Sequence, residues 1–242
     1  MTNLLTNVRG IIFDYGGTID SEGDHWSEVI FDAYHACGIP VAYADFRPAY
    51  IEGERHLART PLVKPSDTFL QVLRLKIARQ FEVLNLRPDR VDAVAQAAEA
   101  VARRCVGAAR PVLEAFANRY PLALVSNFYG NVEAVLADYG IRHLFRAVIE
   151  SAVVGIRKPD PRIFALGCQA LGLEPQHVLV VGDSIDKDIL PAQSLGCPTA
   201  TILGRQWRSA ADSPAPVRPI HFEPNQWPNL QKFAQALLRF IN

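Results

Sequence analysis

The 242-residue sequence has no surplus of charge of either sign, because 25 lysines and arginines balance 25 aspartates and glutamates. Proteins whose main partner is nucleic acid or an anionic membrane carry a basic surplus that this chain lacks. No apolar run approaches the roughly 20 residues that a membrane-spanning helix needs. We therefore expect neither nucleic acid nor a membrane as a partner.

Cysteine is also scarce. The four cysteines are scattered, without a Cys-x-x-Cys pair, at Cys37, Cys105, Cys168 and Cys197. This spacing indicates neither a disulfide framework nor a cysteine metal site, and it favours free thiols in a reducing compartment. Residues 1–9 are too short and too polar for a secretory signal. We expect a soluble, cytoplasmic protein.

What the sequence does contain is an alternation of apolar strands with helices. Strands are predicted at residues 8–13, 122–125, 147–150, 177–181 and 199–203. Helices are predicted after them at residues 113–120, 132–139, 161–171, 189–195 and 229–240, with a loop over residues 204–220. This alternation is typical of parallel βαβ units and predicts an α/β fold with a Rossmann-like parallel sheet core.

The stretch between the first two predicted strands is different, because it has helical periodicity throughout. Apolar residues recur at helical spacing in residues 25–37, 43–57, 69–81 and 88–105. Four helices inserted after the first strand predict a separate helical cap domain. We place the core at residues 1–20 and 106–242 and the cap at residues 21–105.

Polar residues follow three of the predicted strands. Asp14 ends the first strand, Ser126-Asn127 the second, and Asp183 the fourth, while Lys158 lies on a loop expected at the same edge. Each has a purely structural explanation, as a helix cap, a turn residue or a surface lysine. However, open α/β sheets bind their ligands where the carboxyl ends of the strands meet.

Together these residues fit phosphoryl transfer through an aspartyl intermediate. That chemistry needs a carboxylate nucleophile, Mg2+, and donors and a cation for the phosphoryl oxygens. Asp14 is the candidate nucleophile, and Ser126 and Lys158 supply a donor and a positive charge. Asp183 and Asp188 supply the hard oxygen ligands that Mg2+ prefers.

The same residues resemble, in order, the four motifs of the haloacid dehalogenase-like (HAD) hydrolase superfamily. The similar segments are Asp14-Tyr15-Gly16-Gly17-Thr18, Ser126-Asn127, Lys158-Pro159-Asp160 and Gly182-Asp183-Ser184-Ile185-Asp186-Lys187-Asp188. The helical insertion resembles the family's common cap, which closes over the site and selects substrates.

The resemblance implies a role for each matching position. Asp14, Ser126 and Lys158 would be catalytic, and Thr18 and Asn127 would bind substrate. The Mg2+ ligands would be Asp14, the backbone carbonyl of Gly16, Asp183 and Asp188. The implied reaction is hydrolysis of a small phosphorylated metabolite.

Gly16 departs from the family pattern. Phosphatases of this type usually carry a second aspartate there, which protonates the leaving group and later activates water. General acid–base help is worth about 10²–10⁴-fold. Either the natural substrate has a good leaving group, or a cap residue supplies the proton, with Asp20, His25 and His56 as the first candidates.

The same motifs are also compatible with three alternative functions. The missing acid fits a weak or inactive protein that binds a phosphorylated ligand. A metal-free dehalogenase shares Asp14, but Asp183 and Asp188 favour a metal. A phosphonate hydrolase would need a Schiff-base lysine in the cap, for which Lys64 and Lys76 are available.

The sequence leaves the substrate and the oligomeric state open. Cap residues with a positive charge could hold an anionic group or could form a solvated helix face; they are Arg47, Arg55, Arg59 and Lys64. Trp207 could contact substrate or a second subunit.

Overall fold

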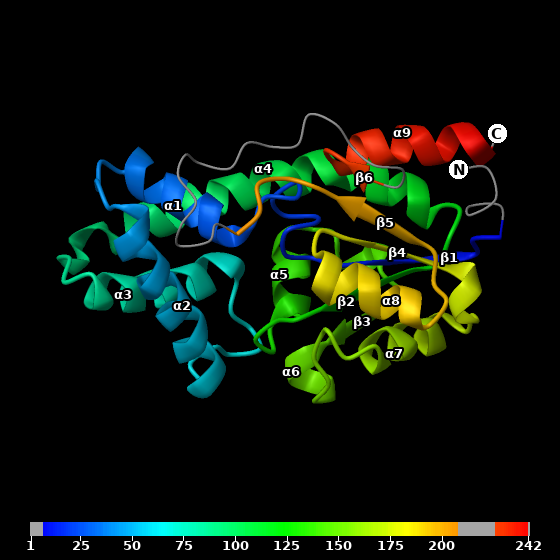
Figure 1. The fold of residues 1–242 in the computed structure, drawn as a ribbon, viewed down its shortest axis with the longest axis horizontal. Coiled ribbons are helices and arrows are strands. Elements are labelled where there is room, and N and C mark those ends of the chain that lie inside the picture. The colour runs from blue at the N-terminus through cyan, green and yellow to red at the C-terminus, as the bar shows by residue number, and fades with distance from the viewer. Residues whose placement is uncertain (1–6, 208–225, 242) are drawn as a thin grey trace.

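The computed structural model describes residues 7–207 and 226–241, and Figure 1 shows a parallel sheet flanked by helices. The sheet has six parallel strands in the order β3-β2-β1-β4-β5-β6. The strands are β1 Gly10–Phe13, β2 Leu122–Ser126, β3 Ala147–Glu150, β4 Val178–Gly182, β5 Thr199–Ile202 and β6 Gln226–Trp227. The predicted α/β fold is confirmed.

Strand β1 lies in the middle of the sheet and has apolar layers on both faces. Ile11 and Phe13 face a cluster that includes Phe116 and Phe233, whereas Ile12 faces a second cluster that includes Phe164. Burial on both faces explains why these strands read as continuous apolar runs rather than as alternating ones.

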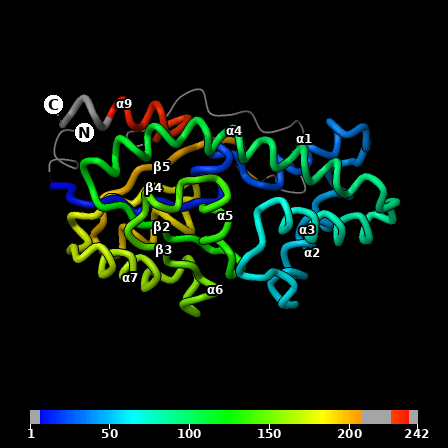
Figure 2. Tube along the Cα trace, turned by 180° about the vertical axis from the view of Figure 1, so that it is seen from behind, coloured from blue at the N-terminus to red at the C-terminus, as the bar shows by residue number. Residues whose placement is uncertain are grey.

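The helices cover the two faces of the sheet. Helices α4 (Val91–Ala117) and α9 (Leu230–Ile241) lie side by side on one face, as Figures 1 and 2 both show. The rings of Phe116 and Phe233 join them, with centroids 5.7 Å apart. The other helices after β2 are α5 Val132–Asp138, α6 Ser151–Val154, α7 Arg162–Leu171 and α8 Leu190–Ser194.

The inserted helices form a lobe beyond the carboxyl edge of the sheet, at the left of Figure 1. They are α1 Trp26–Ala36, α2 Tyr43–Arg59, α3 Phe69–Val83 and the first half of α4. A capping box at Thr68 and Gln71 begins α3. In the described part of the chain, no helix is both long and apolar enough to cross a membrane.

Helix α4 corrects one expectation. A helix ending near Cys105 and a second one from residue 113 were predicted, but one helix runs from Val91 to Ala117 through Pro111. Proline removes one helical hydrogen bond. The buried stripe from Val94 to Phe116 packs against both lobes, and this packing keeps the helix continuous. The predicted domain boundary between residues 105 and 106 falls inside α4 and stays a prediction.

Two further details differ from the sequence expectation. The helix predicted at residues 189–195 begins earlier, as a π-helical turn at Ile185–Ile189 that leads into α8. The two-residue edge strand β6 was not predicted, because it is too short for any hydrophobic period. Most of the loop predicted at residues 204–220 lies outside the described residues.

Candidate active site

Asp14 sits at the carboxyl edge of the sheet, directly after β1. Its N–H donates to the carbonyl of Val181 at 2.9 Å, so the backbone extends the pairing of β1 with β4. Asp183 follows β4 at the same edge. Because parallel strands share this edge, the two carboxylates meet although 169 positions separate them in the chain.

Gly17 allows the chain after Asp14 to approach the Asp183 carboxylate closely. Its φ is 94°, and a Cβ there would lie 2.4 Å from the Asp183 carboxylate. Only glycine therefore fits, for conformational and for steric reasons. The hydroxyl of Thr18 donates to Asp183 Oδ1 at 3.1 Å and orients that carboxylate.

Lys158 connects the acidic residues. Its Nζ lies 2.7 Å from Asp14 Oδ1 and 2.7 Å from Asp188 Oδ1. Asn127 holds the backbone of this lysine at both ends: Lys158 N donates to Asn127 Oδ1 at 2.9 Å, and Asn127 Nδ2 donates to the Lys158 carbonyl at 3.0 Å. The side chain of Asn127 thus positions Lys158.

The cluster of Asp14, Asp183 and Asp188 is buried and strongly acidic. Oxygens of all three lie within 4.8 Å of one another. Burial raises the pKa of Asp14 to about 6, with Lys158 opposing and Asp188 adding to the rise. Burial, followed by the charges of Asp188 and Asp14, also raises the pKa of Asp183 well above its ordinary value.

This cluster has the properties of a divalent metal site. Within the described residues only Lys158 forms an ion pair with it, so ionisation of all three carboxylates would leave two negative charges in excess of one ammonium. Burial would lower the pKa of Lys158, but Asp14 and Asp188 raise it above its usual range and keep it charged. A hard divalent cation with oxygen ligands would neutralise the remainder, so the residues present fit Mg2+.

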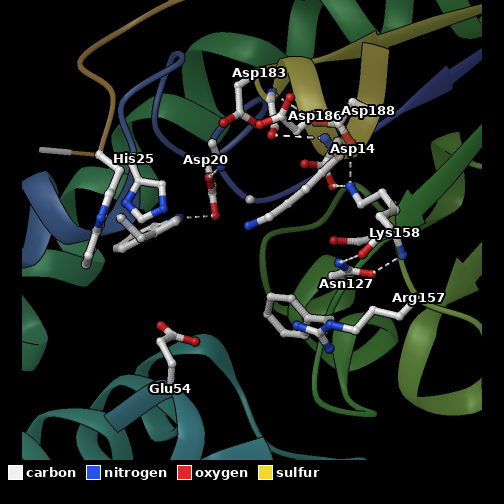
Figure 3. A pocket seen from close by; sticks show the side chains of 18 of the residues that line it. Asp14, Asp20, His25, Glu54, Asn127, Arg157, Lys158, Asp183, Asp186 and Asp188 are labelled. Atoms are coloured by element: carbon white, nitrogen blue, oxygen red, sulfur yellow. Dashed lines mark hydrogen bonds and ion pairs between the residues drawn. The ribbon is translucent and has the colours of Figure 1, made fainter. Parts of the chain in front are cut away.

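A cavity of about 700 Å³ opens over this cluster, between the sheet edge and the cap. Ser126, at the end of β2, and Gly16 both line it. Figure 3 shows the acidic cluster and Lys158 on one wall, and Glu54 of α2 on the opposite wall. All predicted core residues are therefore brought to one cavity, apart from Thr18, which lies behind Asp183.

The candidates for a replacement acid are placed very differently. Asp20 is completely buried, and its oxygens accept from Gly17 N at 2.8 Å and from Trp26 Nε1 at 2.9 Å. Burial raises its pKa to about 7 despite both hydrogen bonds. The carboxyl lines the cavity and its pKa suits an acid, but it has no exposed surface and both of its oxygens already accept hydrogen bonds.

His25 lines the cavity, whereas His56 is not among its lining residues. Ser27 N donates to His25 Nδ1 at 3.1 Å, so the neutral ring carries its proton on Nε2. Burial, with Lys187 adding to it, lowers the pKa of His25 to about 4. The ring is therefore neutral at neutral pH, so it is not a charged acid, and its Nε2–H can donate a hydrogen bond.

Of the two cap lysines, Lys76 lines the cavity and Lys64 does not. Trp207 also lines it, and its ring lies 5.2 Å from Arg47 Cζ, but Arg47, Arg55 and Arg59 are not lining residues. Lining residues that the sequence analysis did not single out include Trp26, Glu54, Tyr129 and Arg157.

Comparison with known proteins agrees with the fold and motifs. A family model of haloacid dehalogenase-like hydrolases matches residues 8–196, so the protein belongs to this family of hydrolases. The predicted family membership is confirmed.

Curated relatives match over short segments. A glyceraldehyde 3-phosphate phosphatase of Methanopyrus kandleri is 41% identical over 67 residues, 28% of this chain and 29% of the relative. The haloacid dehalogenase-like hydrolase domain-containing protein 3 of Mus musculus is 39% identical over 85 residues, 35% of this chain and 34% of the relative. The matched segments span about a third of the length of these relatives.

Solved structures match over nearly the whole chain. An L-2-haloacid dehalogenase of Xanthobacter autotrophicus has a TM-score of 0.58 at 22% identity, covering 96% of this chain and 98% of the other. A Bacillus subtilis protein described as a HAD-hydrolase bound to magnesium has a TM-score of 0.55 at 18% identity, covering 96% and 99%. At these identities the similarity shows the fold.

Proposed function

We propose that the protein is a Mg2+-dependent phosphatase that hydrolyses a small phosphorylated metabolite through an aspartyl-phosphate on Asp14. The observation that carries the proposal is the buried cluster of Asp14, Asp183 and Asp188, bridged by Lys158 at a cavity. Relatives that are named phosphatases give further support. The four free cysteines support action in a reducing compartment such as the cytoplasm.

Each residue has a distinct task in this reaction. An oxygen of Asp14 attacks phosphorus, the bond from phosphorus to the leaving oxygen breaks, and that oxygen takes a proton from water. Lys158 and Ser126 hold phosphoryl oxygens as charge develops on them. Water then attacks the aspartyl-phosphate, which releases phosphate and restores Asp14.

Mg2+, held by Asp14, the Gly16 carbonyl, Asp183 and Asp188, would supply charge neutralisation at the phosphoryl group. Thr18 fixes Asp183 for this task through its 3.1 Å hydrogen bond. Gly16 offers no proton to the leaving group, so we expect acyl and aryl phosphates to react faster than alkyl phosphates.

The alternatives are less well supported by the same geometry. Schiff-base chemistry needs a neutral lysine amine. Burial would lower the pKa of Lys76, but Glu54 raises it above its usual range, so the side chain stays protonated. In a metal-free dehalogenase, ionised Asp14, Asp183 and Asp188 beside Lys158 would together leave two negative charges uncompensated in a buried site. A protein that binds without turnover would not need the reactive Asp14 next to Lys158.

The test is release of phosphate from acetyl phosphate and p-nitrophenyl phosphate with and without Mg2+. We expect turnover that EDTA stops and that Asp14→Asn abolishes. Asp45→Asn, which changes an exposed carboxylate in the first turn of α2, is the matched control. Binding of phosphate esters without turnover would support the inactive alternative, and chloride release from a 2-haloacid without Mg2+ would support the dehalogenase.

A further inference from the structure

Glu54 projects from α2 into the cavity, on the wall that faces Asp14 (Figure 3). Its side chain keeps 34% of its surface exposed, although Lys76 and Tyr50 beside it are buried. Carboxylates that line a cavity and are held in place by other groups are candidates for ligand recognition. Glu54 has no part in the phosphoryl-transfer chemistry proposed above.

Three neighbours fix this carboxylate in position. Lys76 of α3 places Nζ 2.6 Å from Glu54 Oε1, with 5% of the lysine side chain exposed. The hydroxyl of Tyr129, on the core loop after β2, donates to Glu54 Oε2 at 2.5 Å. Tyr50 adds a further side-chain hydrogen bond. Contacts from two cap helices and the core leave Glu54 little freedom to turn away.

These contacts also decide the charge of Glu54. Burial would raise its pKa, but Lys76, Tyr129 and Tyr50 together lower the pKa below its ordinary value. The side chain is therefore an anion at neutral pH, able to accept hydrogen bonds but unable to act as the missing general acid. A carboxylate has about four acceptor positions, and these three donors leave at least one open to the cavity.

We propose that Glu54 accepts a hydrogen bond from a hydroxyl or ammonium group at the end of the substrate farthest from the phosphate. The inference rests on the proposed phosphatase function, since it assumes that the phosphoryl group lies at Asp14. The substrate class is then a phosphate monoester with a hydrogen-bond donor on its organic part. A second anionic group at that end would have no hydrogen to donate to the Glu54 carboxylate.

The distribution of charge along the cavity agrees with this orientation. Lys158 and Arg157 line the core wall beside the acidic cluster, where Mg2+ and the phosphoryl group would bind, and Glu54, paired with Lys76, lies on the cap wall (Figure 3). The lining also includes aromatic rings: Trp26, Tyr50, Phe69, Phe128 and Trp207. Apolar walls exclude water, which strengthens a hydrogen bond to a charged acceptor.

The experiment uses non-hydrolysable alkylphosphonates of increasing chain length that end in a hydroxyl, an amine or a methyl group. Each is measured as a competitive inhibitor of Mg2+-dependent acetyl phosphate hydrolysis by the wild-type protein. At the length that spans the cavity, the hydroxyl or amine compound should inhibit at least about tenfold more tightly than its methyl counterpart. The better of the two end groups distinguishes a hydroxylated from an amino substrate.

Variants then test whether Glu54 causes the preference for inhibitors that end in a hydrogen-bond donor. Glu54→Gln should bring the ratio of inhibition constants close to one. Glu52→Gln, on the same helix and paired with Arg79 at 3.1 Å, should keep the wild-type ratio. Because Glu54→Gln leaves Lys76 without its anion, the double variant Glu54→Gln/Lys76→Met is the substitute if the single variant does not fold.

The possible failures are distinguishable. If no chain length prefers a donor end group, or if the preference survives in Glu54→Gln, the assignment of Glu54 is wrong while the phosphatase stands. If the wild-type protein does not hydrolyse acetyl phosphate with Mg2+, the proposed function is wrong. Calorimetric binding of the same phosphonates then still tests Glu54.

Discussion

Restoring a carboxylate at Gly16 is the most direct test of what limits this active site. A Cβ at this position would meet only Trp26 Cδ1, at 3.9 Å, which is an ordinary van der Waals contact. The backbone φ of Gly16 is not in the left-handed region, unlike that of Gly17. The substitution Gly16→Asp should therefore fold without displacing its neighbours.

The expected gain depends on the leaving group. General acid–base catalysis is worth about 10²–10⁴-fold, or roughly 3–5 kcal/mol of barrier. An alkyl phosphate, whose alkoxide is a poor leaving group, should gain an amount in that range. Acetyl phosphate should gain little, because its leaving group needs no proton. Burial and the neighbouring Asp14 would raise the pKa of the new carboxyl and favour its protonated form.

The assay compares kcat/KM for propyl phosphate and acetyl phosphate at saturating Mg2+. Gly16→Asn is the matched control, since it has the same size without a carboxyl proton to donate. If propyl phosphate hydrolysis by Gly16→Asp stays as slow as in Gly16→Asn and wild type, the reasoning from the missing acid is refuted.

Three other substitutions test the cluster and its surroundings. Asp183→Asn should raise the Mg2+ concentration for half-maximal phosphate release by at least about tenfold, and an unchanged Mg2+ titration would contradict the metal site. Asp20 keeps its proton in the native state up to about pH 7 but loses it near 3.8 when unfolded, so the free energy of unfolding should fall as pH rises between these values. In urea titrations at saturating Mg2+, the free energy of unfolding of Asp20→Asn should fall with pH by up to about 4 kcal/mol less than that of the wild-type protein. Identical pH profiles for the two proteins would show that the Asp20 carboxyl is not protonated in the native state. The hydroxyl of Tyr15 is buried with no partner among the described residues, so Tyr15→Phe should leave stability unchanged or raise it by about 1 kcal/mol; a clear loss in thermal unfolding would reveal a partner.

The fold could be predicted for the segments whose burial requires a recognisable arrangement of apolar residues in the sequence. Strands β1, β2 and β4 are short, fully buried and largely apolar runs because helices cover both faces of the sheet, and polar residues such as Asp14 and Asp183 mark where they end. The same local reasoning failed at Pro111, because a proline is a local signal for a break. The packing that keeps α4 continuous comes from segments far away in the chain, including α9.

The core half of the site could be predicted for a related reason. Parallel strands bring their carboxyl ends to one edge, so residues at several strand ends must converge whatever the intervening chain does. No such rule applies to the cap. The meeting of Glu54, Lys76 and Tyr129 depends on how α2 and α3 pack over the core, and neither helix alone specifies that arrangement.

A signal for these cap residues was nevertheless present. On α2 the buried positions Phe46, Tyr50 and Leu57 form one apolar stripe, and Glu54 falls within it at helical spacing. Lys76 falls in the same way beside Ile77 on α3. A charge inside an apolar stripe must find a partner or a ligand, because an unpaired buried charge is costly. Two opposite charges within the apolar stripes of neighbouring helices therefore predict an ion pair inside the cap. Because part of the Glu54 carboxylate stays exposed to the cavity, this ion pair can also contact a substrate.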